Sequence, residues 1–454
     1  MDPSIFKAYD VRGVYGEQLG PDDAYRIGRA FARVLSDEES KAPADLRVGL
    51  GRDMRLTAPE MAGRYADGMR DEGADVVDVG MVGTEMLYFA VGSHDLDGGL
   101  MCTASHNPAQ YTGAKLVRRG AIALSGDAGI AEVGRLAAGD LGDPAGERGK
   151  LTEEDVGDEF RRAAMKFIEP AEVTGRKVVL DGGNGMAGRM VGPLLDQLPI
   201  EQVAMYWDPN GEFPDHEPNP LLPENRTFIV KKVLSEGAEL GIAWDGDADR
   251  CFFIDDTGQF VDGDFLTALL AQSILAKDAG AKILYDVRAS RAVRDVVEEA
   301  GGTALMNRVG HAFFKVRMRE EDAAFGGEVS GHYYFRDFYC ADSGTIPALL
   351  ILELLSQKGQ RMSELLAGFR SKYFISGEIN SEVADQDAKM REIEERYSDG
   401  EVSHLDGVSV DYPDWHFNVR ASNTEPLLRL NLESLASPEH MEEKRDEVLG
   451  LIRG

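Results

Sequence analysis

The sequence has few cysteines, no long hydrophobic run and a shortage of positive charge. Its three cysteines, Cys102, Cys251 and Cys340, are far apart and form no CxxC pair, which argues against a disulfide framework and a zinc site. No apolar run approaches the roughly 18 residues of a membrane span. The N-terminal residues show no basic-then-apolar targeting pattern. We therefore expect a cytoplasmic protein.

Acidic residues outnumber basic residues along the whole chain. The 80 Asp and Glu residues against 49 Lys and Arg residues give a formal net charge of −31. A surface of this sign repels nucleic acid and anionic membranes, so we expect neither as a partner. Because salt shortens the range of like-charge repulsion, charge spread so widely also favours a surface of the halophilic type.

The chain is long enough for several domains. Its 454 residues are about three times the length of a typical domain. From residue 20 onward, short apolar strands alternate with helical periods, which predicts parallel or mixed sheets covered by helices. A polar stretch at 138–160 precedes a second round, a third begins near residue 255, and the pattern changes near 371. We expect three related α/β units and a smaller α+β unit whose closing helix begins near Pro438.

Three carboxylates directly follow the apolar strand "LGIAW". Asp245, Asp247 and Asp249 alternate with small residues, a spacing that lets three oxygens converge on one hard cation. A solvated acidic turn is the alternative, and such turns are common in so acidic a chain. Arg250 favours the metal interpretation, because a metal ion and a guanidinium together offset the charge of a phosphoryl group.

Ser105 lies in "CTASHNPAQYTGAK" (102–115) and is either a turn-forming residue or the carrier of that phosphoryl group. A hydrolase nucleophile with His106 as its base is a weaker interpretation, because adjacent residues of an extended strand point to opposite faces. The nucleophile elbow G-x-S-x-G is also absent, since Thr103 and Asn107 stand at its glycine positions.

Two further loops carry sugar-binding and phosphate-binding chemistry. In "GGEVSGHYYF", Glu328, Ser330 and His332 alternate, so they offer a carboxylate, a hydroxyl and an imidazole to one side. Polar positions on a solvent-facing strand are the alternative. The turn "RASNTEP" supplies a guanidinium, a hydroxyl and an amide for a phosphate cradle, although such clusters are also ordinary loop composition. Its candidate residues are Arg420, Ser422, Asn423 and Thr424.

Basic side chains end several apolar segments. In a chain this acidic, a group of cations at loop positions would form a local positive site for a phosphorylated anion. Each alone is more often a surface charge. The residues are Arg12, Lys115, Arg288, His311 and Lys315.

Taken in order, these loops resemble a known family. "TASHNP", "DGDADR", "GEVSGH" and "RASNTEP" are similar to the four signature loops of the α-D-phosphohexomutases, one loop per domain. "FKAYDVRG", "GRDMR", "DGGNGMAG", "FPDHEPNP" and "VGHAFFK" also look like family segments. The resemblance implies three related α/β mixed-sheet domains and a smaller α+β C-terminal domain around a central cleft. The expected domains are 1–150 with the phosphoserine loop, 151–254 with the metal-binding loop, 255–370 with the sugar-binding loop and 371–454 with the phosphate-binding loop.

The resemblance also implies a mechanism. Ser105 would carry a phosphoryl group, with Mg²⁺ held between it and Asp245, Asp247 and Asp249. The enzyme would interconvert the 1- and 6-phosphates of mannose, glucose or both through a hexose 1,6-bisphosphate, which also serves as activator. The expected catalytic residues are Ser105, Lys115, His106, Arg250, His311 and His332. The expected substrate-binding residues are Tyr9, Arg12, Arg288, Lys315, Glu328, Ser330, Arg420, Ser422, Asn423 and Thr424.

The resemblance is strongest to bacterial and archaeal phosphomannomutase/phosphoglucomutase sequences, through "GEVSGH" and "FPDHEPNP". Lys115 is the preferred base, and His106 is expected to contact the phosphoryl group.

Thr112 and Glu85 depart from the usual pattern, and we expect altered local turns there rather than lost activity. A phosphoglucosamine mutase, a magnesium-dependent sugar-phosphate phosphatase and a non-catalytic binding protein are the rival functions. The sequence leaves the oligomeric state open.

Overall fold

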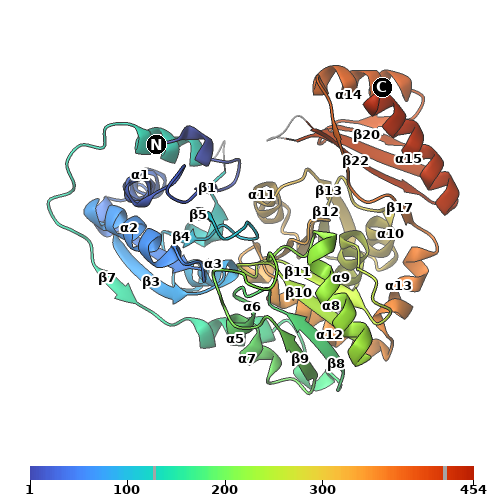
Figure 1. Cartoon of the computed structure of the whole chain (residues 1–454), viewed down its shortest axis with the longest axis horizontal. Helices are drawn as coiled ribbons and strands as arrows, with labels where there is room; N and C mark the ends of the chain where they lie inside the picture. The colour runs from blue at the N-terminus through green and yellow to red at the C-terminus, as the bar shows by residue number, and fades with distance from the viewer. Residues whose placement is uncertain (126–128, 423–426) are drawn as a thin grey trace. The chain divides into compact units, whose positions relative to one another are not determined.

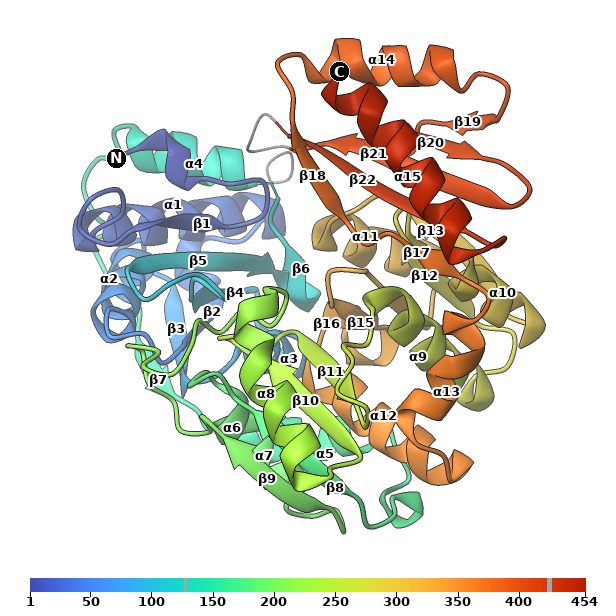
Figure 2. The same cartoon turned by 45° about the vertical axis from the view of Figure 1, so that its right-hand side comes forward.

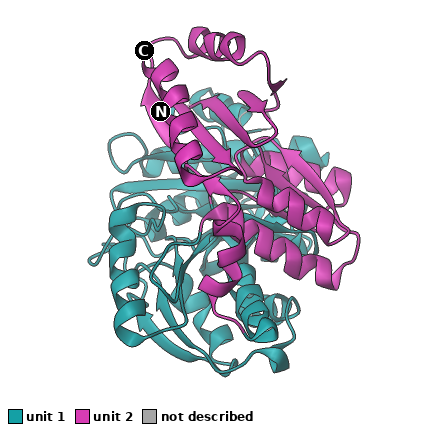
Figure 3. Ribbon diagram, turned by 90° about the vertical axis from the view of Figure 1, so that its right-hand side faces the viewer, with its two compact units in different colours: residues 1–261, 331–359 teal, residues 262–330, 360–454 magenta. Residues whose placement is uncertain are grey.

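The computed structural model divides into two compact units, coloured separately in Figure 3. Unit 1 comprises residues 1–261 and 331–359, and unit 2 comprises residues 262–330 and 360–454. The residues that the structure describes are 1–125, 129–422 and 427–454.

Unit 1 begins with a mixed sheet in the order β1-β5-β4-β2-β3-β7, with β6 paired to β5. Strand β2 runs parallel to β3 and β4, whereas β5 runs antiparallel to both β1 and β4, beside which it lies in Figure 2. The strands are β1 (Val11–Val14), β2 (Arg47–Arg52), β3 (Asp75–Met81), β4 (Gly98–Cys102), β5 (Tyr111–Arg118), β6 (Ile122–Ala123) and β7 (Leu151–Glu153).

Four helices accompany this sheet, and α1 packs along α2 (Figure 1). The expected helical spacing is confirmed in α1, where Ile27, Phe31 and Leu35 are fully buried. Pro21 begins this helix, and Asp22 and Asp23 lie in its first turn, where their charges oppose the positive end of the helix dipole. The helices are α1 (Pro21–Glu39), α2 (Ala58–Asp71), α3 (Thr84–Ser93) and α4 (Ile130–Ala138).

A second mixed sheet in unit 1 has the order β11-β10-β8-β9. All five residues of β10 are buried, as is usual for a strand covered on both faces. The strands are β8 (Lys177–Asp181), β9 (Glu201–Met205), β10 (Leu240–Trp244) and β11 (Cys251–Asp255), and unit 1 also contains the pair β15 (Tyr333–Phe335) and β16 (Ala341–Asp342). The helices are α5 (Gly157–Met165), α6 (Ala187–Met190), α7 (Gly192–Leu195), α8 (Pro223–Glu236) and α12 (Thr345–Lys358).

Unit 2 contains parallel strands and a separate antiparallel sheet. Strand β12 pairs in parallel with β13 and β14. The strands are β12 (Lys282–Asp286), β13 (Thr303–Asn307) and β14 (Phe325–Gly327), and the helices are α9 (Gly263–Lys277), α10 (Arg291–Glu299), α11 (His311–Glu321) and α13 (Met362–Arg370).

The antiparallel sheet has the order β17-β22-β21-β20-β19, with β18 paired to β22. Its strands are β17 (Phe374–Ile375), β18 (Ile379–Glu382), β19 (Glu401–Ser403), β20 (Val408–Asp411), β21 (Trp415–Ala421) and β22 (Leu427–Ser434), and its helices are α14 (Gln386–Arg396) and α15 (Pro438–Arg453). The closing helix begins at Pro438, as predicted. The two mixed sheets of unit 1, the parallel strands of unit 2 with their helices and this antiparallel α+β part confirm the predicted fold class.

Within residues 1–125, 129–422 and 427–454, none of the helices combines the length and the hydropathy of a membrane span.

Candidate active site

Ser105 lies in the loop after β4, at the carboxyl edge of the first sheet, where ligands bind in open α/β sheets. Its φ of 49° is in the left-handed region, and its backbone N–H donates to Thr103 Oγ1 at 2.8 Å. The hydroxyl donates to Asp245 Oδ2 at 3.0 Å, and only 4 % of the residue is exposed. The turn therefore directs Ser105 toward the carboxylates of a different sheet.

The expectation that Ser105 and His106 point to opposite faces is wrong. Ser105 Oγ lies 3.3 Å from His106 Nδ1, because the left-handed turn at Ser105 ends the strand geometry on which the expectation rested. However, Arg250 also reaches Nδ1, at 2.6 Å. A guanidinium only donates, so Nδ1 is the acceptor and its lone pair is engaged by Arg250. His106 is therefore poorly placed to take the proton of Ser105.

Arg55 holds the loop that carries Ser105 (103–110, here the serine loop) in place. Only its position in the segment "GRDMR" pointed to Arg55 before the structure was known. Its guanidinium donates to the carbonyl oxygens of Ser105 at 2.8 Å and Asn107 at 2.6 Å. It also donates to those of Pro108 and Tyr111. Arg55 is 2 % exposed, and β2 and β4 end together with Arg52 opposite Cys102. The parallel register thus brings the arginine beneath the serine loop.

The Asp245, Asp247 and Asp249 carboxylates come together in the loop between β10 and β11. Their candidate ligand oxygens lie within 4.8 Å of one another, and the residues are at most 1 % exposed. Two of the oxygens, Asp247 Oδ1 and Asp249 Oδ1, are buried without a hydrogen-bond partner in the part of the chain that the structure describes. Such orphaned carboxylate oxygens suit a hard divalent cation, so the residues present fit a metal site.

Gly246 allows the loop of the three aspartates (245–249), called the metal-binding loop after its expected role, to approach the serine loop. A Cβ atom at this position would lie 2.5 Å from the carbonyl oxygen of Ser105 and 3.3 Å from Cγ of Pro218. Pro218 belongs to the segment "FPDHEPNP", where His216 Nε2 lies 3.1 Å from Asp181 Oδ2. Glycine is therefore required here by close packing of two backbones.

Lys115, on β5, is the cation nearest the triplet. Its Nζ donates to Asp247 Oδ2 at 2.7 Å and also to Asp249 Oδ2. Although burial opposes the charge, these carboxylates raise the pKa of Lys115 well above its ordinary value. Burial alone would raise the pKa of Asp247, but the charge of Lys115 outweighs this effect and lowers the pKa below its ordinary value. For Asp249, burial and then the charge of Asp247 raise the pKa well above its usual value. Lys115 thus stands as an ammonium counter-charge.

Arg250 completes the site on the Asp245 side. Its Nε and NH2 atoms donate to Asp245 Oδ2 at 3.0 and 2.8 Å. Burial, followed by the charges of Arg250 and Arg12, lowers the pKa of His106 well below its ordinary value, so the imidazole is neutral. Arg12 donates to Asn107 Oδ1 and to an aspartate just before β1, and Tyr9 is partly buried in the same segment.

His332 lies near Asp249, also within unit 1. Its candidate ligand atom lies within 4.8 Å of those of Asp249 and Asp342, and its Nε2 is 4.0 Å from Asp342 Oδ2. Unit 1 therefore brings together Ser105, His106, Lys115, Arg250, His332 and the three aspartates.

The other predicted residues lie in unit 2. Arg288 and Glu328 follow β12 and β14, whose parallel register brings their carboxyl ends together. Glu328 Oε1 accepts the N–H of Gly310 at 2.8 Å, directly before α11, and lies 4.0 Å from Arg288 NH2. His311 and Lys315 lie on α11, where Lys315 is fully buried. Ser330 is partly buried.

Arg420 lies near the end of β21, and Ser422 directly follows this strand. Arg288 NH1 and Arg420 NH2 lie 3.3 and 3.1 Å from the same oxygen, Glu378 Oε2. Ser422 is 8 % exposed, and its N–H donates to Leu427 O. Asn423 and Thr424 lie outside the described residues.

Glu85 was expected to alter only a local turn, yet it forms a buried contact far along the chain. It is fully buried, and its two carboxylate oxygens accept hydrogen bonds from the hydroxyls of Ser343 and Thr345. The preceding residue, Thr84, donates through its hydroxyl to Asp247 Oδ2. The N-terminus of α3 therefore joins the metal-binding loop to the start of α12.

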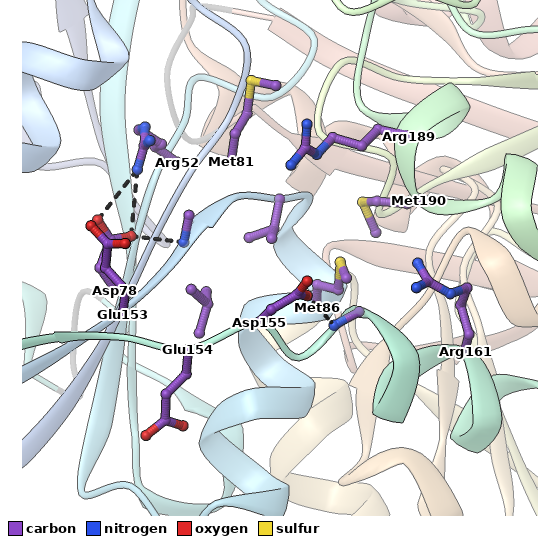
Figure 4. Close-up of a pocket in the computed structure, with 14 residues that line it drawn as sticks. Arg52, Asp78, Met81, Met86, Glu153, Glu154, Asp155, Arg161, Arg189 and Met190 are labelled. Atoms are coloured by element: carbon purple, nitrogen blue, oxygen red, sulfur yellow. Dashed lines mark hydrogen bonds and ion pairs between the residues drawn. The ribbon is translucent and has the colours of Figure 1, made fainter.

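A cavity of about 630 Å³ lies on the other side of the α3 N-terminus. Figure 4 shows Arg161 and Arg189 on one side of it and Arg52 on the other, around Met86 and Met190. Met190 Sδ accepts the N–H of the residue that precedes Thr84. The cavity is separate from the candidate site, because its lining among the described residues includes neither Ser105 nor any of Asp245, Asp247 and Asp249.

A serine hydroxyl against a carboxylate triplet, with arginines around it, defines an enzyme of phosphoryl transfer. Models of the phosphoglucomutase/phosphomannomutase domains match almost the whole chain: α/β/α domain I at 3–136, α/β/α domain II at 158–258, α/β/α domain III at 262–373 and the C-terminal domain at 378–451. The chain belongs to the phosphoglucomutase/phosphomannomutase family of phosphohexomutases, which are intramolecular phosphotransferases.

Individual relatives agree with this assignment. A phosphomannomutase of Salmonella montevideo is 44 % identical over 460 aligned positions, covering 99 % of both chains. A protein of Xanthomonas campestris pv. campestris described as phosphohexose mutases is 42 % identical, again over 99 % of both. A crystal structure of a phosphoglucomutase/phosphomannomutase family protein from Burkholderia thailandensis has a TM-score of 0.90 and 35 % identity, covering 99 % of this chain and 97 % of that one. The sequence resemblance is confirmed, and the rival functions are not favoured.

Proposed function

We propose that the protein interconverts hexose 1-phosphates and hexose 6-phosphates through a phosphoserine at Ser105. The observation that carries this proposal is the 3.0 Å hydrogen bond from Ser105 Oγ to Asp245 Oδ2, beside two buried carboxylate oxygens that lack a hydrogen-bond partner among the described residues. A serine hydroxyl that is buried against a cation-binding triplet is suited to carry and return a phosphoryl group.

The three aspartates and Ser105 are the residues that would hold Mg²⁺. The bound cation would offset negative charge on the phosphoryl group during transfer. Arg250 neutralises Asp245 and presents its NH2 atom toward the serine loop. His106, a neutral imidazole next to Ser105 in that loop, is the proposed contact of the phosphoryl group.

The transfer requires a residue that accepts the proton of the attacking sugar hydroxyl and returns it in the reverse direction. Lys115 is our first candidate, because its Nζ lies among the carboxylates. Although burial opposes the charge, these carboxylates raise its pKa, so it serves as a counter-charge and proton donor and would accept the proton of a sugar hydroxyl only after giving up its own. His332 is the second candidate beside Asp249. His311 remains a candidate in unit 2. Arg288 is assigned to phosphate contact, because a guanidinium does not release its proton at neutral pH.

The substrate would be a phosphorylated hexose, with its non-reacting phosphate bound by residues of unit 2. Arg420 and Arg288 share one carboxylate partner and so present a concentrated positive charge. Asn423 and Thr424 are expected to contribute to the same cradle. Glu328 and Ser330 are the proposed readers of the sugar hydroxyls, and Lys315, Tyr9 and Arg12 the proposed additional contacts.

Mannose and glucose phosphates are the preferred substrates, through a hexose 1,6-bisphosphate intermediate. Support for mannose comes from the relatives named phosphomannomutase, and support for both sugars comes from the family description.

A coupled assay tests the proposal with mannose 1-phosphate, glucose 1-phosphate and glucosamine 1-phosphate, each with Mg²⁺ and a trace of the matching 1,6-bisphosphate. We expect isomerised product from mannose 1-phosphate, glucose 1-phosphate or both. Preference for glucosamine 1-phosphate would instead assign the glucosamine branch. Release of inorganic phosphate without isomerised product would identify a phosphatase.

A further inference from the structure

Three arginines of unit 2 surround one carboxylate. Glu378 Oε2 lies 3.3 Å from Arg288 NH1 and 3.1 Å from Arg420 NH2, and Glu378 Oε1 lies 3.2 Å from Arg429 NH1. We call Arg288, Arg420 and Arg429 the arginine cluster. Its members come from the end of β12 and from the neighbouring strands β21 and β22. Glu378 lies between β17 and β18.

The cluster needs an anion at this position. Arg420 and Arg429 are direct partners in the antiparallel ladder, and like charges placed opposite one another destabilise a strand pair. Burial, followed by the charge of Arg288, lowers the pKa of Arg420. Although burial opposes it, the charge of Arg288, followed by those of Arg420 and Arg429, lowers the pKa of Glu378. Glu378 is therefore ionised and offsets the mutual repulsion of the cluster.

The backbone around Glu378 presents the carboxylate to the arginines. Ser376 is fixed to β22, because its N–H donates to Leu432 O at 2.8 Å and its Oγ accepts the N–H of Leu432 at 3.0 Å. Gly377 then adopts a φ of 67°, a left-handed conformation that glycine adopts without strain. The side chain of Glu378 remains 26 % exposed, so solvent reaches this ion cluster.

A carboxylate and a phosphate bind guanidinium groups through the same type of charge-assisted hydrogen bond. We propose that Glu378 is an internal competitor for the phosphate of the substrate: it occupies the arginine cluster in the free enzyme, and the phosphate displaces it. This inference rests on the proposed function for the assignment of Arg288 and Arg420 to phosphate binding. It adds Arg429 to the phosphate site and gives the site a built-in opposing charge.

Glu378→Gln tests the competition. The variant keeps the shape of the side chain and removes its charge. Asp286, which accepts hydrogen bonds from Arg288 at 3.0 and 2.8 Å, remains paired with that arginine, so the cluster gains one net positive charge for an incoming anion. We expect inorganic phosphate, titrated by calorimetry against the full chain, to bind the variant about threefold to tenfold more tightly than the wild type. Glu382→Gln is the matched control, because Glu382 is exposed on the adjacent strand β18, and its phosphate affinity should equal that of the wild type.

Equal or weaker phosphate binding by Glu378→Gln would overturn the proposal, because a purely structural carboxylate organises the arginines and its loss weakens the site. Arg429→Gln gives an independent result if Glu378→Gln does not fold. We expect it to bind phosphate at least about threefold more weakly, and unchanged affinity would count against the inference.

Neither titration needs turnover, so its outcome is independent of the proposed function. If Glu378→Gln binds phosphate more tightly but the wild type does not isomerise sugar phosphates, the proposed function fails and the competition stands. In an active enzyme, we expect Glu378→Gln to lower KM by a similar factor without raising kcat, because tighter binding of substrate and transition state alike changes KM rather than kcat.

Discussion

The contact between the serine loop and the metal-binding loop provides a sharp test through Gly246→Ala. The new Cβ atom would lie 2.5 Å from the carbonyl oxygen of Ser105, whereas non-bonded heavy atoms prefer about 3.5 Å. The backbone at Gly246 is outside the left-handed region, so alanine adds no dihedral strain there. The substitution therefore acts by pushing the two loops apart by about 1 Å.

The size of the effect follows from this displacement. A misplacement of about 1 Å in an active site costs about 10²-fold in rate, so we expect kcat to fall by about two orders of magnitude. Overpacking costs about 1–3 kcal/mol. Each kcal/mol lowers Tm by about 2–4 °C in domains of about 150–250 residues. The variant should therefore remain folded at the assay temperature while its kcat falls.

The measurement is the coupled mutase assay together with thermal unfolding, on Gly246→Ala and on Gly63→Ala as control. Gly63 lies within α2, and a Cβ atom there meets nothing within 4 Å. The control should keep the wild-type rate and gain up to about 1 kcal/mol from better helix propensity. A Gly246→Ala enzyme whose kcat stays within threefold of the wild type would refute the proposed dependence of transfer on this loop contact.

Three further predictions concern charge. Asp247→Asn should lower kcat by about 10²–10³-fold while circular dichroism shows an intact fold, and a near-normal rate would contradict its assignment as a metal ligand. Burial raises the pKa of Glu85 from 4.5 to about 8; between these pH values the folded chain holds a proton that the unfolded chain releases, so stability falls as pH rises. In denaturant unfolding at several pH values, the free energy of unfolding of Glu85→Gln should fall less between pH 4.5 and about 8 than that of the wild type. An equal pH dependence of the two proteins would refute the raised pKa of Glu85. With a net charge of −31, the wild type should melt at a higher temperature in molar KCl than in dilute buffer, and the reverse order would exclude the halophilic interpretation.

The sequence was sufficient for the fold class and for the grouping of Ser105 with the three aspartates. Both loops directly follow short apolar strands, but these strands belong to different sheets. The grouping therefore followed from the chemistry of phosphoryl transfer and from the family resemblance, and not from a shared sheet edge. The alternation of Asp245, Asp247 and Asp249 predicts a cation site by itself, because three neighbouring carboxylates repel one another unless a cation offsets their charge.

Other contacts could not be read from the sequence because they depend on pairing between distant segments. Glu85 meets Ser343 across 258 positions of the chain, and no local pattern near either residue signals this contact. Arg55 acts on Ser105 through the register of two strands. Nothing in the segment "FISGEINSEV" distinguishes Glu378 from its neighbours, and only the arrangement of β12, β21 and β22 brings arginines to it.

The geometry of Ser105 was likewise decided by one backbone angle. Alternation along a strand predicted that Ser105 and His106 diverge, but the left-handed turn at Ser105 brings Oγ and Nδ1 within 3.3 Å. Positive φ at a serine is uncommon, so a rule for regular strands did not anticipate it.

The most direct test of the central claim follows the phosphoryl group itself. The wild-type enzyme and Ser105→Ala are incubated with radiolabelled glucose 1,6-bisphosphate, freed of excess label and mixed with unlabelled glucose 1-phosphate. We predict that the wild type alone carries one labelled phosphoryl group, at Ser105, and passes it to the sugar as bisphosphate. Label on Ser105→Ala, or label released from the wild type as inorganic phosphate, would contradict the assignment of Ser105 as the carrier in a mutase.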